Sequence, residues 1–183
     1  MILPRFRLGS QARSIHALYG AIVAQARAAA FYADYGVPDT LEGRFDLIVL
    51  HLVLLLNRLS RPPEVSRSLG QDLFDEFCRD LDANLREMGV GDLAVPKRMQ
   101  RFAEAFYGRQ AAYLAALEAA DARDFEKALA RNIYADGIDD DEAARLAVYA
   151  RAAVERLDAQ EDDALIRGEV VFPSPEAFVD ARA

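Results

Sequence analysis

The sequence predicts an all-α protein: a single-domain helical bundle of about six helices, followed by a short extended C-terminal tail. Three observations support this fold class. Hydrophobic residues make up 52% of the chain and charged residues 28%, alanine is frequent and tryptophan is absent, as is typical of soluble helical proteins. Apolar residues recur every three or four positions over most of the chain. Glycine, proline and capping residues separate these stretches.

The length predicts one domain. A chain of 183 residues can bury roughly 70% of its unfolded surface around a single core. No internal repeat and no Gly/Ser-rich linker interrupts the sequence. We therefore expect a single helical domain over residues 1–183.

The first two helices are predicted from their ends. Ser10 can cap a first helix whose apolar stripe continues to about Ala33. A Tyr-Gly-Val-Pro segment ends it, and Asp39 followed three residues later by Glu42 resembles a capping box that starts the second helix. This second helix extends to about Ser60 and carries leucine, isoleucine and valine on every side. That pattern predicts the central helix of the bundle.

Two further helices are predicted over residues 65–88 and 96–119, joined by a rigid corner. Gly89 suits the left-handed conformation that closes a helix, and Pro96 suits the first turn of the next one, where its missing N–H has no helical partner. The short connection predicts a hairpin of packed helices. The residues of this structural corner are Gly89, Gly91, Asp92 and Pro96.

The C-terminal third predicts two shorter helices and a tail. The helices are expected over residues 121–134 and 139–157, the second starting with an acidic run that stabilises the positive end of its dipole. Residues 161–163 are expected to lie in solvent. Residues 168–175 read as an extended tail that can fold back through the apolar side chains of 170–172.

The net charge of the chain limits the classes of partner that it can bind. The net charge is −8 and the isoelectric point about 4.8, so bulk electrostatics oppose binding to nucleic acid and to anionic lipid. We expect no nucleic-acid partner, and any basic site must be local. The single Cys78 leaves no internal disulfide, and no cleavable signal peptide opens the sequence, which favours the cytoplasm. The longest apolar run, residues 47–56, is shorter than the roughly 20 residues of a membrane-spanning helix.

Residues 1–9 mix apolar side chains with Arg5 and Arg7. We interpret them as a terminal arm. The alternative is a weak peripheral contact with the inner face of the cytoplasmic membrane, because basic and apolar residues together favour anionic lipid.

Arg44, His51 and Arg58 recur every seven residues along the otherwise apolar second helix. Because buried polar groups need hydrogen-bond partners, one interpretation is that they bond to acids or carbonyl groups of neighbouring helices. The other is a polar strip that lines a groove and faces a partner. A metal or catalytic role for His51 is disfavoured, because the other histidine, His16, lies on a different helix and no residues stand at ligand spacing.

The helix after the corner is locally basic, whereas the helix before it has an acidic outer face. These charges can pair across the hairpin or leave a basic patch facing outward. Phe106 and Tyr107 stand beside Gly108, which permits close approach of another backbone, and Tyr, Phe and Arg are enriched at recognition surfaces. The basic residues are Lys97, Arg98, Arg101 and Arg109.

Motifs of known catalytic chemistry are missing. The sequence contains no phosphate-binding loop, dinucleotide fingerprint, nucleophile elbow or zinc-ligand spacing. We therefore expect no enzyme activity, no cofactor and no metal. On the residues alone, the chain is a helical protein with a mixed-charge, aromatic-edged surface, and its function stays open.

Two stretches resemble the ubiquinol-cytochrome c chaperone family. They read YGVPDTLEGRFDLIVLHLVLLLNRL (35–59) and QDLFDEFCRDLDANLREMGVGDLAVPKRMQRFAEAFYGRQAAYLAAL (71–117), with LREMGVGD, VPKRM and FYGR in the family's order. The resemblance covers a core of about residues 32–117 and is weak over the C-terminal helices, about residues 121–162. It implies a non-enzymatic assembly factor of respiratory complex III that binds newly made cytochrome b at the cytoplasmic face of a bacterial membrane.

The resulting hypothesis is a groove between the second, third and fourth predicted helices, with the corner at its rim, that holds a segment of apocytochrome b. Aromatic side chains would supply apolar contacts and basic ones would hold its polar ends. The candidate client-binding residues are Arg44, His51, Arg58, Lys97, Arg98, Met99, Phe106, Tyr107, Arg109 and Tyr113.

Two rival functions stay open. One is a small-ligand protein that holds haem or quinone in its apolar core, with His51 or Tyr107 as a polar contact. The other is a generic protein-interaction module, for which a homodimer through the alanine-rich first helix is the simplest form. The sequence does not predict the oligomeric state.

Overall fold

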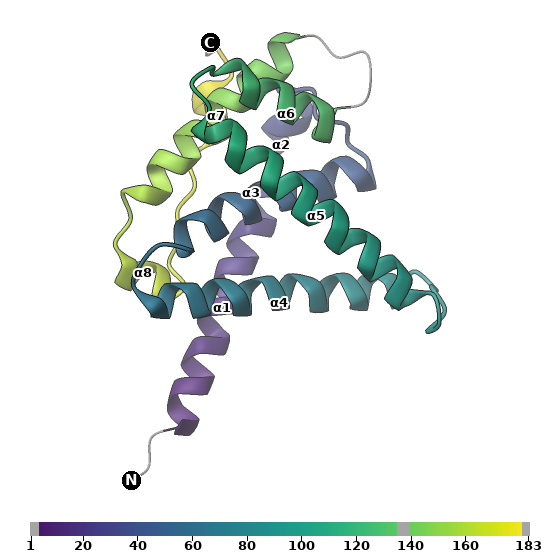
Figure 1. The fold of residues 1–183 in the computed structure, drawn as a ribbon, viewed down its shortest axis with the longest axis vertical. Helices are drawn as coiled ribbons and strands as arrows, with labels where there is room; N and C mark the ends of the chain where they lie inside the picture. Colours follow the sequence, from purple (N-terminus) through teal and green to yellow (C-terminus); the bar gives the residue numbers. More distant parts are fainter. Residues whose placement is uncertain (1–3, 135–139, 181–183) are drawn as a thin grey trace.

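The computed structural model describes residues 4–134 and 140–180 and contains only helical secondary structure over these residues. This confirms the predicted all-α bundle. The helices are α1 (Pro4–Ala26), α2 (Ala29–Ala33), α3 (Leu41–Leu59), α4 (Glu64–Glu87), α5 (Val95–Glu118), α6 (Arg123–Ile133), α7 (Asp140–Asp158), α8 (Asp162–Ile166) and the short 3-10 helix η1 (Pro175–Phe178). In Figure 1, α4, α5 and α7 form the sides of a triangular body around α3.

The first predicted helix is divided in two. The backbone of Ala28 is extended, with φ −59° and ψ 129°, and separates α1 from the short α2. The Tyr32 hydroxyl donates a 2.7 Å hydrogen bond to the carbonyl of Ala26, which satisfies an acceptor that the helix end leaves open. The break turns Phe31 into the core, where it is fully buried. Helix α1 also begins earlier than the predicted Ser10 cap, at Pro4.

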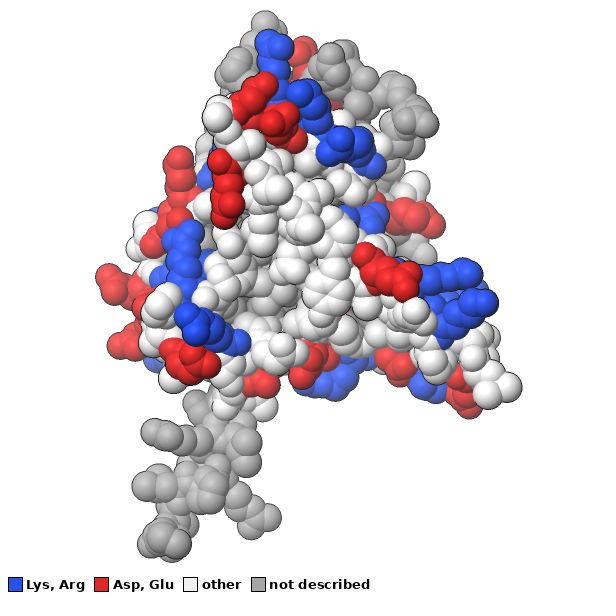
Figure 2. Space-filling view, viewed as in Figure 1, with Lys and Arg blue, Asp and Glu red and all other residues white. Residues whose placement is uncertain are grey.

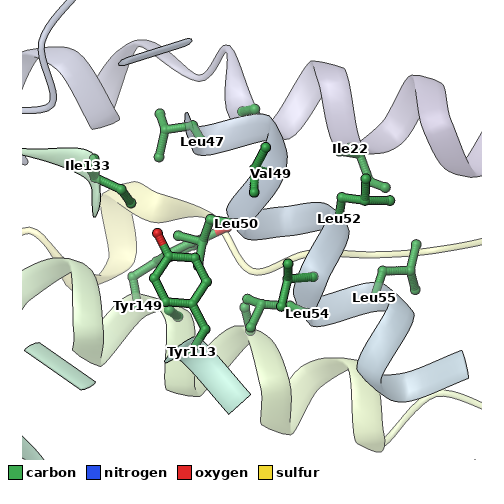
Figure 3. Packing of buried hydrophobic residues seen from close by; sticks show 14 of the residues in the cluster. Ile22, Leu47, Val49, Leu50, Leu52, Leu54, Leu55, Tyr113, Ile133 and Tyr149 are labelled. Carbon is green, nitrogen blue, oxygen red and sulfur yellow. The ribbon is translucent and has the colours of Figure 1, made fainter. Parts of the chain in front are cut away.

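Helix α3 is the central element, as predicted. Twelve of its 19 residues are buried, and it contacts α1, α4, α5, α6 and α7. Figure 3 shows Leu52 packed toward Ile22 on one side of the helix and Leu50 toward Tyr113 and Tyr149 on another. The helix has apolar side chains all round because it has neighbours all round.

The cap of α3 differs from the prediction by one residue. The Thr40 hydroxyl, not the Asp39 carboxylate, accepts a 3.1 Å hydrogen bond from the backbone N–H of Gly43. The Asp39 carboxylate instead accepts a 2.7 Å hydrogen bond from Arg44. Both residue types cap helices well, so the sequence alone did not separate them.

The corner between α4 and α5 has the predicted chemistry. Gly89 has φ +79°, and the N–H groups of Gly89 and Val90 donate to the carbonyls of Arg86 and Leu85 at 2.9 and 3.0 Å, the bond pattern of a Schellman helix end. Pro96 lies in the first turn of α5. The Asp92 carboxylate accepts a hydrogen bond from Arg86, which ties the connection back to α4.

The C-terminal residues pack against α3 through α7 and α8. The predicted acidic run covers residues 139–142; Asp139 lies outside the described part of the chain, and α7 begins at the next residue. Residues 161 and 163 are exposed, as expected, whereas Asp162 opens α8 and bonds to Arg58. The tail folds back as expected: Phe172 packs against the core, and Tyr35 donates a 2.6 Å hydrogen bond to the carbonyl of Pro175.

No helix in the described part of the chain is long and apolar enough to cross a membrane.

Candidate functional site

His51 is held by a chain of hydrogen bonds inside the bundle. The side chain is fully buried; its Nδ1 lies 2.7 Å from the carbonyl of Leu47 and its Nε2 lies 2.8 Å from the Tyr149 hydroxyl. Because a carbonyl only accepts, Nδ1 carries the proton and Nε2 accepts from Tyr149. Gln25 in turn donates to the Tyr149 hydroxyl at 3.0 Å and to the carbonyl of Pro173 at 2.9 Å.

The imidazole of His51 is neutral in this setting. Burial lowers the pKa of His51 to about 4, against a smaller opposing effect of the bond to Leu47. Both ring nitrogens are occupied by protein groups, and the chain of hydrogen bonds through Tyr149 and Gln25 joins α1, α3, α7 and the C-terminal tail. Of the two interpretations of the polar residues on this helix, internal hydrogen bonding therefore holds for His51. No lone pair of its ring is left for a ligand.

Arg58 is also bonded inside the protein. Its guanidinium donates to the carbonyls of Leu157 and Gln160 at 3.1 and 2.8 Å and to the carboxylate of Asp162 at 2.7 Å. Only 9% of the side chain is exposed. These bonds satisfy carbonyl groups at and just beyond the end of α7 and fix the start of α8.

Asp46 and Arg109 form a partly buried ion pair between α3 and α5. Their charged atoms are 2.8 Å apart, and the side chains are 10% and 21% exposed. Burial raises the pKa of the Asp46 carboxyl to about 6, although Arg109 pulls it down. Arg109 is therefore engaged inside the chain, and fully buried Tyr113 lies beside this pair.

Helices α3, α4 and α5 enclose a surface groove with an aromatic floor. Its cavity volume is about 310 Å³. The ring of Phe74 lies 4.8 Å from that of Phe106 and 5.8 Å from that of Tyr107, centroid to centroid. Polar side chains stand at the margin. The lining residues are Leu56, Leu59, Ser60, Arg67, Gly70, Gln71, Phe74, Phe106, Tyr107 and Gln110.

Tyr107 is the most accessible aromatic ring of this groove. Its side chain is 55% exposed, whereas Phe106 is only 2% exposed. No atom lies within 4 Å of the position that a Cβ on Gly108 would take, so the close backbone approach allowed by this glycine does not occur within the described chain. Figure 2 shows uncharged side chains across the centre of this face and charged side chains along its margins. The groove can thus accept an apolar group from outside.

The predicted client-binding residues fall into four places. His51, Arg58, Arg109 and Tyr113 are bonded or packed inside; Phe106 and Tyr107 line the groove; Lys97, Arg98 and Met99 lie near the corner between α4 and α5; and Arg44 lies on the surface, paired with Asp39. The structure therefore brings only Phe106 and Tyr107 together in the groove. Sequence reasoning missed Phe74, Gln71 and Gln110, and the one available signal was that Phe74 stands next to the apolar stripe of α4.

The described residues contain no group of three His, Cys, Asp or Glu side chains placed to bind a metal ion.

The chain matches one known family over most of its length. The model of the family described as ubiquinol-cytochrome C chaperone matches residues 33–172. The chain belongs to the ubiquinol-cytochrome c chaperone family. A crystal structure of the Cbp3 homolog from Brucella abortus is similar, with 38% sequence identity and a TM-score of 0.87, covering 95% of this chain and 96% of that one. A comparison with curated proteins finds no match.

Membership of the ubiquinol-cytochrome c chaperone family covers more of the chain than the sequence resemblance did. The match continues through α6, α7 and α8 to Phe172, where the sequence resemblance was weak. This extension agrees with the structure, because Arg58 and His51 of α3 are bonded to the residues that follow α6. The family identifies the chain as a chaperone of complex III assembly and implies a role other than catalysis.

Proposed function

We propose that this chain holds an apolar segment of newly made cytochrome b in the groove between α3, α4 and α5 during assembly of ubiquinol-cytochrome c reductase. The observation that supports this most is the exposed ring of Tyr107 above the buried aromatic floor. It is more exposed than any other aromatic side chain whose exposure the structure describes. Exposed aromatic groups at a groove are typical anchors of protein recognition.

The size of the groove suits a peptide segment. A volume of about 310 Å³ is at the lower end for small-molecule sites and accommodates a few side chains of a helix that presents apolar anchors one turn apart. The amides of Gln71 and Gln110 and the hydroxyl of Ser60 can bond to polar atoms of the segment at the groove margin. Such a surface holds an unassembled segment while leaving it free to be released.

We propose the cytoplasmic face of the membrane as the site of action, because the proposed client, cytochrome b, is a membrane protein and the chain belongs to the ubiquinol-cytochrome c chaperone family. The haem-binding rival lacks support: a haem ligand at His51 would have to break the bonds to Leu47 and Tyr149. The homodimer through the first helix stays a prediction.

Replacing Tyr107 by alanine is expected to reduce the cytochrome b that copurifies with the chain by about tenfold, since an anchor at a protein interface contributes on the order of 1–2 kcal/mol. The assembled complex should fall with it. The measurement is the amount of cytochrome b recovered with the tagged chain, together with the level of complex III in the same membranes.

The matched control is Leu41→Ala, which also shortens an exposed apolar side chain, 64% exposed at the start of α3 and outside the groove. Both variants should keep the helical signal of the parent chain. If Tyr107→Ala retains cytochrome b as well as Leu41→Ala does, this groove is not the client site.

A further inference from the structure

The corner between α4 and α5 exposes apolar side chains that have no partner in the described chain. We call residues 88–101 the hairpin tip. Leu93 is 99% exposed and Met88 is 62% exposed. Figure 1 shows the corner at the far end of α4 and α5, away from the rest of the body. Exposed apolar side chains on a fixed turn are unfavourable in water and point to an interaction surface.

Basic side chains follow these apolar ones in the first two turns of α5. Lys97, Arg98 and Arg101 are exposed, and none of them forms an ion pair with the described residues. Of the nearby carboxylates, Asp92 bonds to Arg86 and Glu104 accepts from Gln100, whereas the exposed Glu87, which precedes Met88, forms no ion pair with the described residues. Figure 2 shows the resulting group of basic side chains at the end of the hairpin.

The local charge is opposite in sign to that of the whole chain. Residues 88–101 hold three basic residues and one acidic residue, whereas the chain has a net charge of −8. The first turn of α5 contains no acidic side chain, and no side chain caps it. The positive end of the helix dipole therefore adds to the charge of Lys97 and Arg98 instead of offsetting it.

We propose that the hairpin tip binds the surface of an anionic phospholipid membrane, with Leu93 and Met88 entering the interfacial layer and the three basic side chains contacting the headgroup phosphates. Exposed apolar side chains together with nearby cations match the apolar and the anionic character of that layer. The tip is convex, and its residues line neither the groove nor the hollow beside Thr40 and Asn132. A fluid lipid surface accommodates such a protrusion without a preformed pocket.

Lipid binding at the tip would also position the groove. Arg98 and Tyr107 are nine residues apart on α5, which places them about 14 Å apart along the helix axis. A segment emerging from the membrane could thus reach the groove while the tip stays on the lipid. The lipid contact itself does not rest on the proposed client and is tested without cytochrome b.

The test is flotation of the purified full chain with vesicles of phosphatidylcholine alone or of phosphatidylcholine mixed with phosphatidylglycerol, at low and at high salt. We expect binding to the anionic vesicles only, weakened by salt. Replacing Lys97, Arg98 and Arg101 together by glutamine should lower the binding constant roughly a hundredfold, because each basic residue near an anionic surface contributes about a factor of five. Leu93→Ser should weaken binding at both salt concentrations.

Two control variants test whether a loss of vesicle binding is specific to the tip or follows from any loss of positive charge or of exposed apolar surface. Arg13, Arg123 and Arg131 are exposed and unpaired within the described residues, so changing all three to glutamine removes the same charge elsewhere. Leu41→Ser matches Leu93→Ser. Equal losses in the tip and control variants, or no binding of the parent chain to anionic vesicles, would overturn the proposal.

Two other outcomes would place the lipid contact elsewhere in the chain or give the tip a protein partner. Vesicle binding that survives the tip variants and disappears with Arg5→Gln and Arg7→Gln would place the membrane contact in the N-terminal arm. Absence of vesicle binding, together with loss of a complex III subunit from purified Leu93→Ser protein, would show that the tip docks on a protein. Either result rejects lipid binding by the tip and leaves the groove proposal standing or falling on its own test.

Discussion

Replacing Arg58 by methionine is expected to lower the free energy of unfolding by about 3–5 kcal/mol. The change removes the donor for the carbonyls of Leu157 and Gln160 and leaves the Asp162 carboxylate without its cation. The side chain is 9% exposed, so water replaces few of these bonds. Methionine keeps most of the apolar stem, which limits the loss to the polar contacts.

Thermal unfolding followed by circular dichroism measures this effect, and a midpoint lowered by roughly 10 °C is expected for a chain of this size. Arg44→Met is the matched control. It lies fourteen residues earlier on the same helix and forms an exposed ion pair with Asp39, a kind of pair that contributes little. Equal midpoints for the two variants would show that the Arg58 contacts do not hold the C-terminal helices to α3.

Replacing Arg109 by alanine is expected to lower the free energy of unfolding by about 2–4 kcal/mol at neutral pH, because it leaves the partly buried Asp46 carboxylate without its cation. Client binding would then be lost through instability of the fold, not through a missing surface contact. Adding Asp46→Asn should recover part of the loss, since no unpaired buried charge remains.

The pH dependence gives a second check on this pair. The pKa of Asp46 is about 6 in the folded chain, against an ordinary value of 3.8, so the folded state binds a proton more readily than the unfolded one between these values. Stability from this group therefore increases as the pH falls from about 7 to about 4. Removing Arg109 raises the pKa of Asp46 further. On acidification, the stability of the Arg109→Ala variant should therefore begin to recover at a higher pH than the same contribution does in the parent chain.

The contribution of His51 to the pH dependence of stability has the opposite sign. Its pKa is lowered from 6.5 to about 4, so the unfolded chain takes up a proton first and stability is lost as the pH falls between these values. Comparing Arg109→Ala with the parent chain at each pH cancels this contribution. A stability difference that does not shrink on acidification would contradict the role assigned to Asp46.

The sequence predicted the features of this fold that local chemistry determines. The apolar surface of residues 41–59 identified the central helix, and Gly89 and Pro96 identified the corner, because their backbone preferences act within a turn. The break between α1 and α2 carries no proline or glycine signal, and the Tyr32–Ala26 bond became visible only in the folded chain. Helix α8 was missed for a similar reason, since Asp162 is bonded to a residue 104 positions away.

In the candidate site, too, the sequence predicted what local chemistry determines and not what contacts between distant residues determine. Phe106 and Tyr107 were identified from their aromatic character and their place beside Gly108, and they line the groove. The spacing of Arg44, His51 and Arg58 allowed either internal bonds or an outward strip, and only the partners on α7 and α8 decide between the two. Phe74 and Gln71 were missed because the helix that carries them was interpreted by its acidic outer face.

Site-specific photo-crosslinking tests the central claim most directly. A photoreactive residue at Gln110, in the groove, is compared in the native host with one at Ala12, an exposed position of α1 outside it. The account predicts a crosslink to cytochrome b from the groove position, depleted by Tyr107→Ala, and none from Ala12. A folded, abundant chain that crosslinks cytochrome b equally from both positions, or from neither, would contradict it.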